Sequence, residues 1–217
     1  MHTSPEESPG PALRPFLFAF VLFVLLMALA EGAAQFKVPL GIGAEHSVDF
    51  RRVIFTIWVA IALLTPALCL HVFSRRGAPN GYWRAFWTFA YLALLTHLCW
   101  AGFGTCHGDF AAILDGRGAD IDRECIVGHP WPDLFLAAWW GLDVVLAWLV
   151  TDDIAWVRVE RHAVHLLAFA MFFGAFVLDA KAGVVAHLLG IVMTLAVVSC
   201  VVLRLILRRT AGTATPT

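Results

Sequence analysis

Long apolar stretches separated by short polar segments dominate the pattern of this 217-residue chain. Six stretches approach the length of about 20 residues that an α-helix needs to cross the core of a bilayer. They cover residues 16–34, 53–73, 82–104, 132–150, 162–178 and 182–207. No run alternates as the strands of a membrane barrel do, and in lipid a helix satisfies its own backbone hydrogen bonds. The pattern therefore predicts an all-α, polytopic integral membrane helical bundle with about six transmembrane helices.

Composition supports a membrane protein with one domain over residues 1–217. Hydrophobic residues make up 60% of the chain and charged residues 14%, and the mean hydropathy is +0.80. An ordinary soluble domain has about 25% charged residues. The net charge of -1 gives no indication of nucleic-acid binding, and no nucleic-acid partner is expected. The bilayer is the expected partner, and other membrane subunits remain an open alternative.

The basic residues favour an orientation with the N-terminus and the C-terminus in the cytoplasm, in a multi-pass protein of a bacterial inner membrane. This orientation places nine of the 15 Lys and Arg residues on the cytoplasmic side, as the positive-inside rule requires. The nine are Arg14, Arg75, Arg76, Arg84, Arg158, Arg161, Arg204, Arg208 and Arg209. The extracytoplasmic loop is then 105–131, in an acidic segment. Arg51 and Arg52 are the exception, because they fall on the outer side.

The first apolar run has two interpretations. Residues 16–30 are unbroken apolar sequence followed by Glu31 and three small residues, which fits a cleaved signal peptide. The leader carries Glu6 and Glu7 and a single arginine, which favours a retained membrane anchor.

Four histidines lie at membrane depth, where ionisable groups are costly and are candidates for function. His71 and His165 are expected at a similar inner depth, and His97 and His187 both in the outer half. Two depth-matched pairs are what a b-type cytochrome with two haems needs, because each iron takes one imidazole from each of two facing helices. Haem b is therefore one predicted cofactor. The alternative is that each histidine is hydrogen-bonded to a neighbouring helix.

Asp143 is a single carboxyl group near the middle of the fourth apolar run. Its predicted depth is within about 5 Å of that of His97 at about 1.5 Å per residue, so a hydrogen bond between the two is feasible. Such a pair would orient an imidazole that binds a metal, or would relay protons. A buried acid with a purely structural partner is the alternative. The charged residues from Asp152 to Arg161 are interpreted as a solvated inner turn.

The outer loops concentrate side chains that bind metals. His46, His107 and His129, with Asp109, are all predicted on one side of the membrane, and nitrogen and oxygen ligands of this kind suit copper or zinc. Their spacing matches no closed metal motif. The alternative is that these loop histidines bind no metal.

Cys106 and Cys125 are the two cysteines outside the apolar runs. In an oxidising outer compartment they are expected to form a disulfide that closes a loop and stabilises it by about 3 kcal/mol.

Three classes of function fit these residues. The first is a redox subunit that transfers electrons through haem or an outer metal. The second is a proton- or ion-coupled transporter that uses Asp143 and His97. The third is a structural or assembly subunit of a membrane complex without a reaction of its own. No motif for a phosphate loop or a nucleophile elbow is present, so no catalytic residue is predicted.

Overall fold

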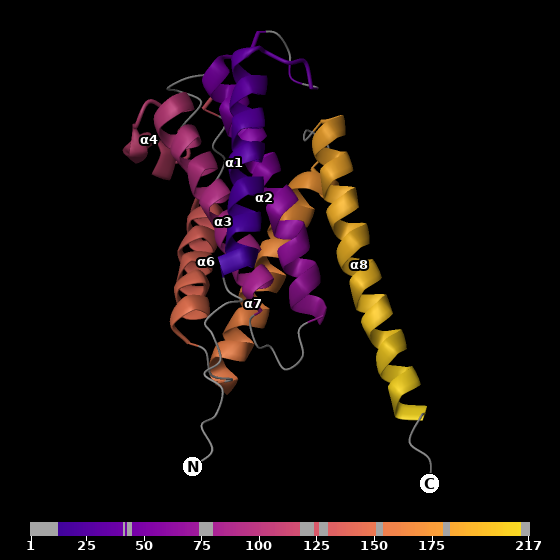
Figure 1. Cartoon of the computed structure of the whole chain (residues 1–217). Coiled ribbons are helices and arrows are strands. Elements are labelled where there is room, and N and C mark those ends of the chain that lie inside the picture. The colour runs from indigo at the N-terminus through magenta and orange to yellow at the C-terminus, as the bar shows by residue number, and fades with distance from the viewer. Residues whose placement is uncertain are drawn as a thin grey trace, which may run out of the picture.

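The fold is described from a computed structural model that places residues 13–40, 42, 45–73, 80–117, 124–125, 130–150, 154–179 and 183–213. Every regular element among these residues is a helix (Figure 1). The elements are α1 (Leu13–Gln35), α2 (Val48–Phe73), α3 (Gly81–Cys99), η1 (Trp100–Thr105), α4 (Phe110–Leu114), α6 (Trp131–Leu149), α7 (Ala155–Phe173), η2 (Gly174–Leu178) and α8 (Val184–Thr213). The segments η1 and η2 are π-helical and continue α3 and α7.

Six helices of the described chain are long and apolar enough to cross a membrane: α1, α2, α3 with η1, α6, α7 with η2, and α8. The predicted all-α membrane bundle is confirmed. Three boundaries differ from the prediction by five residues or more, because α2 begins at Val48, α7 begins at Ala155 and α8 ends at Thr213. At the starts of α2 and α7 the helix includes charged residues that interrupt the apolar run but keep one face of the helix buried.

The core of the bundle lies around α2, which packs against α1, α3 and α8. Leu63 and Leu64 of α2 and Trp87 and Ala90 of α3 are fully buried there. Helices α6 and α7 pack against each other and cover the side of α3, whereas α8 leans away from the other helices toward its C-terminal end (Figure 1). The outer surfaces of α1 and α8 expose many large apolar residues, as expected for helices that face lipid.

Arg51 and Arg52, the exceptions to the positive-inside rule, both make contacts within the bundle. Arg51 is fully buried in the first turns of α2. Arg52 binds Glu31 of α1, with 2.9 Å between Nε and Oε2, and Asp49, with 2.8 Å between Nη1 and Oδ1. Its guanidinium also lies 4.3 Å above the Trp100 ring. Two nearby carboxylates thus balance this charge, and the pair with Glu31 ties α1 to the bundle.

Gly190 marks a close contact between α8 and η2. A Cβ at this position would lie 2.8 Å from Cβ of Phe176 and 3.0 Å from its backbone carbonyl carbon. Because backbone cannot move aside as a flexible side chain can, Gly190→Ala is expected to lower the free energy of unfolding by about 1–3 kcal/mol. Denaturant titration in detergent micelles measures this change. Gly32→Ala is the control, since its Cβ would meet nothing within 4 Å, and an equal loss in both variants would contradict the contact.

Candidate functional site

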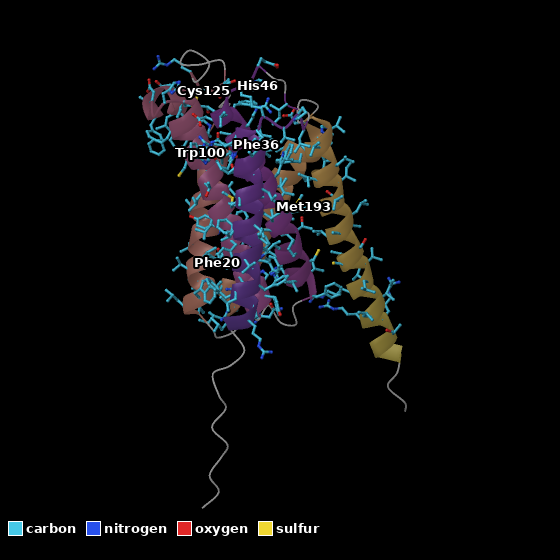
Figure 2. The ribbon with its side chains drawn as sticks, turned by 45° about the horizontal axis from the view of Figure 1, so that its top comes forward. Phe20, Phe36, His46, Trp100, Cys125 and Met193 are labelled. Carbon is cyan, nitrogen blue, oxygen red and sulfur yellow. A yellow bond between two sulfur atoms is a disulfide. The ribbon has the colours of Figure 1, made fainter. Side chains whose placement is uncertain are left out.

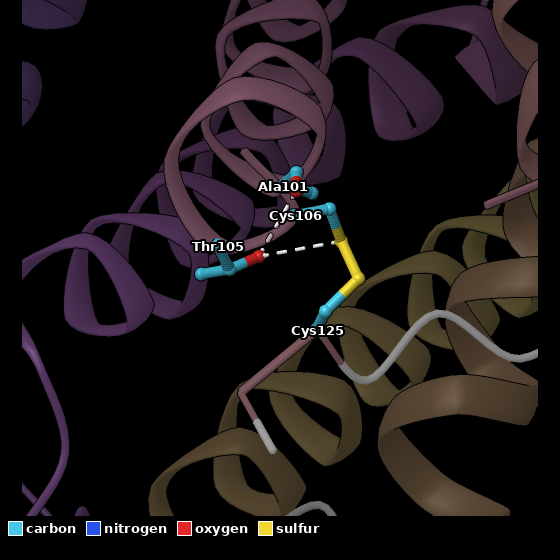
Figure 3. The surroundings of a disulfide bond; sticks show 4 residues. All are labelled: Ala101, Thr105, Cys106 and Cys125. Atoms are coloured by element: carbon cyan, nitrogen blue, oxygen red, sulfur yellow. Dashed lines mark hydrogen bonds between the residues drawn. A yellow bond between two sulfur atoms is a disulfide. The ribbon is translucent and has the colours of Figure 1, made fainter. Parts of the chain in front are cut away.

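The end of the bundle that carries α4 contains the predicted disulfide (Figure 3). Cys106 and Cys125 are bonded, with 4.9 Å between their Cα atoms, and both side chains are buried. The Thr105 hydroxyl lies 3.8 Å from the Cys106 sulfur and donates to the carbonyl of Ala101 at 2.9 Å. The disulfide therefore joins the end of η1 to the loop before α6.

His46 lies at the same end of the molecule as Cys125 (Figure 2). Its Nδ1 is 3.3 Å from Oε1 of Glu124, and its ring stacks on Phe50 with 4.2 Å between centroids. Glu124 also accepts hydrogen bonds from the backbone N–H of Ser47, at 2.8 Å, and from the Ser47 hydroxyl. Partial burial raises the pKa of the Glu124 carboxyl, but these hydrogen bonds and His46 outweigh it and hold the pKa below its usual range.

The predicted outer metal ligands are only partly described. His107 and Asp109 follow η1 in a turn in which His107 has a positive φ of 51°. His129 lies outside the described residues. Within the described part of the chain, no three His, Cys, Asp or Glu side chains converge to hold a metal. The copper or zinc site therefore stays a prediction.

His97 and His187, the expected outer haem ligands, do not face each other. Nδ1 of His97 donates to the carbonyl of Val53 on α2 at 2.9 Å. Nδ1 of His187 donates to the carbonyl of Gly183 in its own helix at 2.9 Å. The reason is the arrangement of helices, since α8 packs mainly on α2 and η2.

His71 and His165, the expected inner ligands, lie in one cluster. Their rings stack with 3.9 Å between centroids and 20° between planes. The His165 Nδ1 donates to the carbonyl of Arg161 at 2.6 Å, and its Nε2 accepts from the Trp83 indole at 3.0 Å. The Nε2 of His71 is 2.8 Å from Nδ1 of His162.

This arrangement does not fit a haem held by His71 and His165. An iron with two imidazole ligands needs two nitrogen lone pairs that point toward it from opposite sides. Rings stacked face to face with 3.9 Å between centroids leave no space for an iron between two ring nitrogens, and both nitrogens of His165 already have partners. Haem at these residues would require the two rings to separate.

Asp143 pairs with Arg161 of α7, whereas His97 bonds to Val53. The distance from Arg161 Nε to Asp143 Oδ1 is 3.3 Å. Asp143 is fully buried and Arg161 is 4% exposed, so this ion pair lies inside the bundle. The Arg161 guanidinium also lies 4.9 Å from the Trp83 ring, which closes one side of the pair.

Glu160 brings a second carboxyl group to this pair. It accepts a hydrogen bond from the Trp139 indole at 2.9 Å and interacts with the Asp143 carboxyl. The second oxygens of the two acids, Asp143 Oδ2 and Glu160 Oε2, are buried and make no well-formed hydrogen bond with a described residue, although the Trp87 indole interacts with the Asp143 carboxyl. Two buried acceptors that lie together without a donor are satisfied when one of them carries a proton.

Glu160 and Arg161 are the residues that the sequence interpretation missed, because it assigned them to a solvated turn. The signal was present in the spacing of Val157, Arg161, Val164 and Ala168. These four residues are buried and lie on one helical face.

Two cavities lie beside His97. One of about 410 Å³ lies between α2, α3, α6 and η2, and one of about 320 Å³ lies beneath α4. Both are lined by His97 and Asp133.

Comparison with known proteins assigns no family to the chain, since no protein-family model matches it and no curated protein or solved structure was found to be similar. Function is therefore inferred from the side chains and cavities of the chain itself.

Proposed function

We propose that this multi-pass membrane protein is a proton-coupled transporter whose proton-binding site is the Asp143–Glu160 carboxyl pair. The observation that carries the proposal is the contact of the buried Asp143 carboxyl with the partly buried Glu160 carboxyl, because the second oxygen of each acid is buried and makes no well-formed hydrogen bond with a described residue. Ionisable groups within a membrane are expensive, and proton relays are one of the roles for which they are retained.

Charge balance favours one proton on this pair. Asp143, Glu160 and Arg161 have a net charge of -1 when both acids are ionised and are neutral when one acid is protonated. Because an uncompensated charge away from water is costly, the protonated state suits a closed and dry site. Uptake and release of the proton then change the charge of the α6–α7 interface by one unit. Such a change is able to drive a conformational change.

The histidine cluster supports proton exchange with the inner end of the bundle. Asp143 lies six residues from the end of α6, or about 9 Å at about 1.5 Å per residue. His71 lies two residues from the inner end of α2 beside His162, which is exposed there, and it stacks on His165, one turn deeper in α7 than Arg161. A neutral imidazole relays a proton when one nitrogen accepts it as the other nitrogen releases one.

We also propose that both termini are cytoplasmic and that the membrane is a bacterial inner membrane. The described chain begins and ends at the end of the bundle opposite the Cys106–Cys125 disulfide (Figure 1). Disulfides persist in oxidising compartments outside the cytoplasm, so the disulfide end fits the outer side. The second apolar run then ends inside and the acidic loop lies outside, as the basic residues suggest.

Labelling with dicyclohexylcarbodiimide tests the proton site. This apolar reagent adds to a protonated carboxyl group, which transfers its proton to one nitrogen as its oxygen bonds to the central carbon, and the adduct rearranges to a stable acylurea. Peptide mass spectrometry is expected to find one adduct, on Asp143 or Glu160, whose yield falls at alkaline pH. Glu160→Gln is expected to remove the adduct, because the amide supplies a donor to Asp143 and keeps the Trp139 bond.

The control for labelling is Asp115→Asn, which removes an exposed acid at the other end of the molecule. Proton flux into liposomes under an imposed potential is then compared between the wild type and Glu160→Gln. Absence of an adduct at both acids would remove the proposed site. An adduct with equal flux in both proteins would keep the site and reject transport.

A further inference from the structure

Two adjoining cavities meet at His97 in the half of the bundle that carries the disulfide. They have volumes of about 410 Å³ and 320 Å³ and share His97, Leu98 and Asp133 as lining residues. Each volume is within the range of about 300–1,000 Å³ that is usual for ligand sites. Together they form two chambers that meet at these three residues, which we call the waist.

The waist carries two polar groups that both accept hydrogen bonds. Nδ1 of His97 donates to Val53, so Nε2 bears the lone pair. Neither this nitrogen nor the Asp133 carboxylate makes a hydrogen bond or an ion pair with another described residue. The waist therefore offers an imidazole acceptor and a carboxylate with no donor supplied by the described chain.

The chambers themselves are apolar. Ile57, Leu94 and Phe172 line the larger chamber, and Phe110 and Ile113 line the smaller one. A mostly apolar cavity with a few convergent polar groups is the usual form of a small-molecule site. Its walls suit hydrocarbon, and its waist suits a polar head group.

Both π-helical segments line these chambers. Ala101 and Gly102 of η1 contribute to the smaller chamber, and Gly174 and Phe176 of η2 contribute to the larger one. Single π-helical turns within α-helices are rare and are frequent at functional sites. A Cβ at Gly174 would meet nothing within 4 Å, so this glycine leaves part of the larger chamber open.

We infer that the two chambers bind an amphiphile whose head group donates hydrogen bonds, a primary ammonium or a phenolic hydroxyl. A primary ammonium donates to both Asp133 and Nε2 of His97, a phenolic hydroxyl donates to one of them, and in either case the hydrocarbon fills a chamber. Ligands with a carboxylate or phosphate head group are excluded, since they bring no donor to a carboxylate. The site is separate from the Asp143–Glu160 pair and does not depend on the proposed proton role.

The test is equilibrium binding to the full-length protein in nanodiscs, with empty nanodiscs subtracted. The probes are dodecylammonium, 4-dodecylphenol, dodecyltrimethylammonium and dodecanoate. The first two are expected to bind, and the last two at least about tenfold more weakly, because they lack a donor. Asp133→Asn is expected to weaken the binding of dodecylammonium more than the binding of 4-dodecylphenol, which distinguishes a cationic ligand from a neutral one.

Gly174→Leu tests the chamber without removing a polar group. It places a side chain in open space and is expected to abolish binding of both donor probes. Gly32→Leu is the matched control, because it adds the same side chain at an equally open helical position away from both chambers. The Glu160→Gln variant is expected to bind both donor probes as the wild type does. A negative result for the proton site is therefore distinguishable from a negative result for the ligand site. Equal binding of dodecanoate, or unchanged binding in Gly174→Leu, would overturn the inference.

Discussion

Arg161→Leu is expected to lower the free energy of unfolding by about 3–5 kcal/mol, because removing one partner of a buried ion pair leaves the other without a compensating charge. The Asp143–Arg161 pair is 0% and 4% exposed, so water does not replace the lost guanidinium. The remaining Asp143 and Glu160 must then both be protonated in the folded state. Because the folded state binds more protons than the unfolded chain, the loss is expected to grow as pH rises. Denaturant titration in detergent micelles at several pH values measures it.

A double-mutant cycle separates the ion pair from general loss of packing. Asp143→Leu combined with Arg161→Leu leaves no unpaired charge at the pair and is expected to be more stable than Arg161→Leu alone. Arg208→Leu is the control, since this arginine is exposed at the end of α8. Additive losses in the double variant would show that the two side chains do not stabilise each other.

Loss of the Cys106–Cys125 disulfide is expected to cost about 3 kcal/mol, because the bond closes a loop between residues separated by 19 positions. The variant Cys106→Ser with Cys125→Ser has no bond to reduce, so its unfolding free energy is expected to be the same with and without reductant. The wild type is expected to fall toward it in reductant. Cys99→Ser, at an exposed free cysteine, provides the control.

Reduction also tests orientation. In sealed cells, a reductant that cannot cross the membrane is expected to expose the Cys106 and Cys125 thiols to labelling from outside. Labelling that appears only after the cells are opened would place this end of the bundle in the cytoplasm. That result would reverse the proposed orientation.

The helical class and the spans were predictable because their causes are local. A run of apolar residues long enough to cross hydrocarbon must be helical whatever surrounds it, and six such runs are present. The disulfide was also predictable, since Cys106 and Cys125 are the two cysteines outside the apolar runs. Run length was a poorer guide at the start of α7, where Glu160 and Arg161 interrupt the apolar sequence although Arg161 is buried.

The partners of the intramembrane side chains depended on the tertiary structure. Depth along a helix follows from counting residues, and it matched His97 with His187 and with Asp143. Which helices are neighbours, and how each is rotated about its axis, depends on how all six pack together. That packing turns Asp143 toward Arg161 and Glu160 and stacks His71 on His165. The sequence alone thus determined a helical membrane bundle, because the bilayer acts on each segment separately, whereas the polar sites required side chains from different helices to meet.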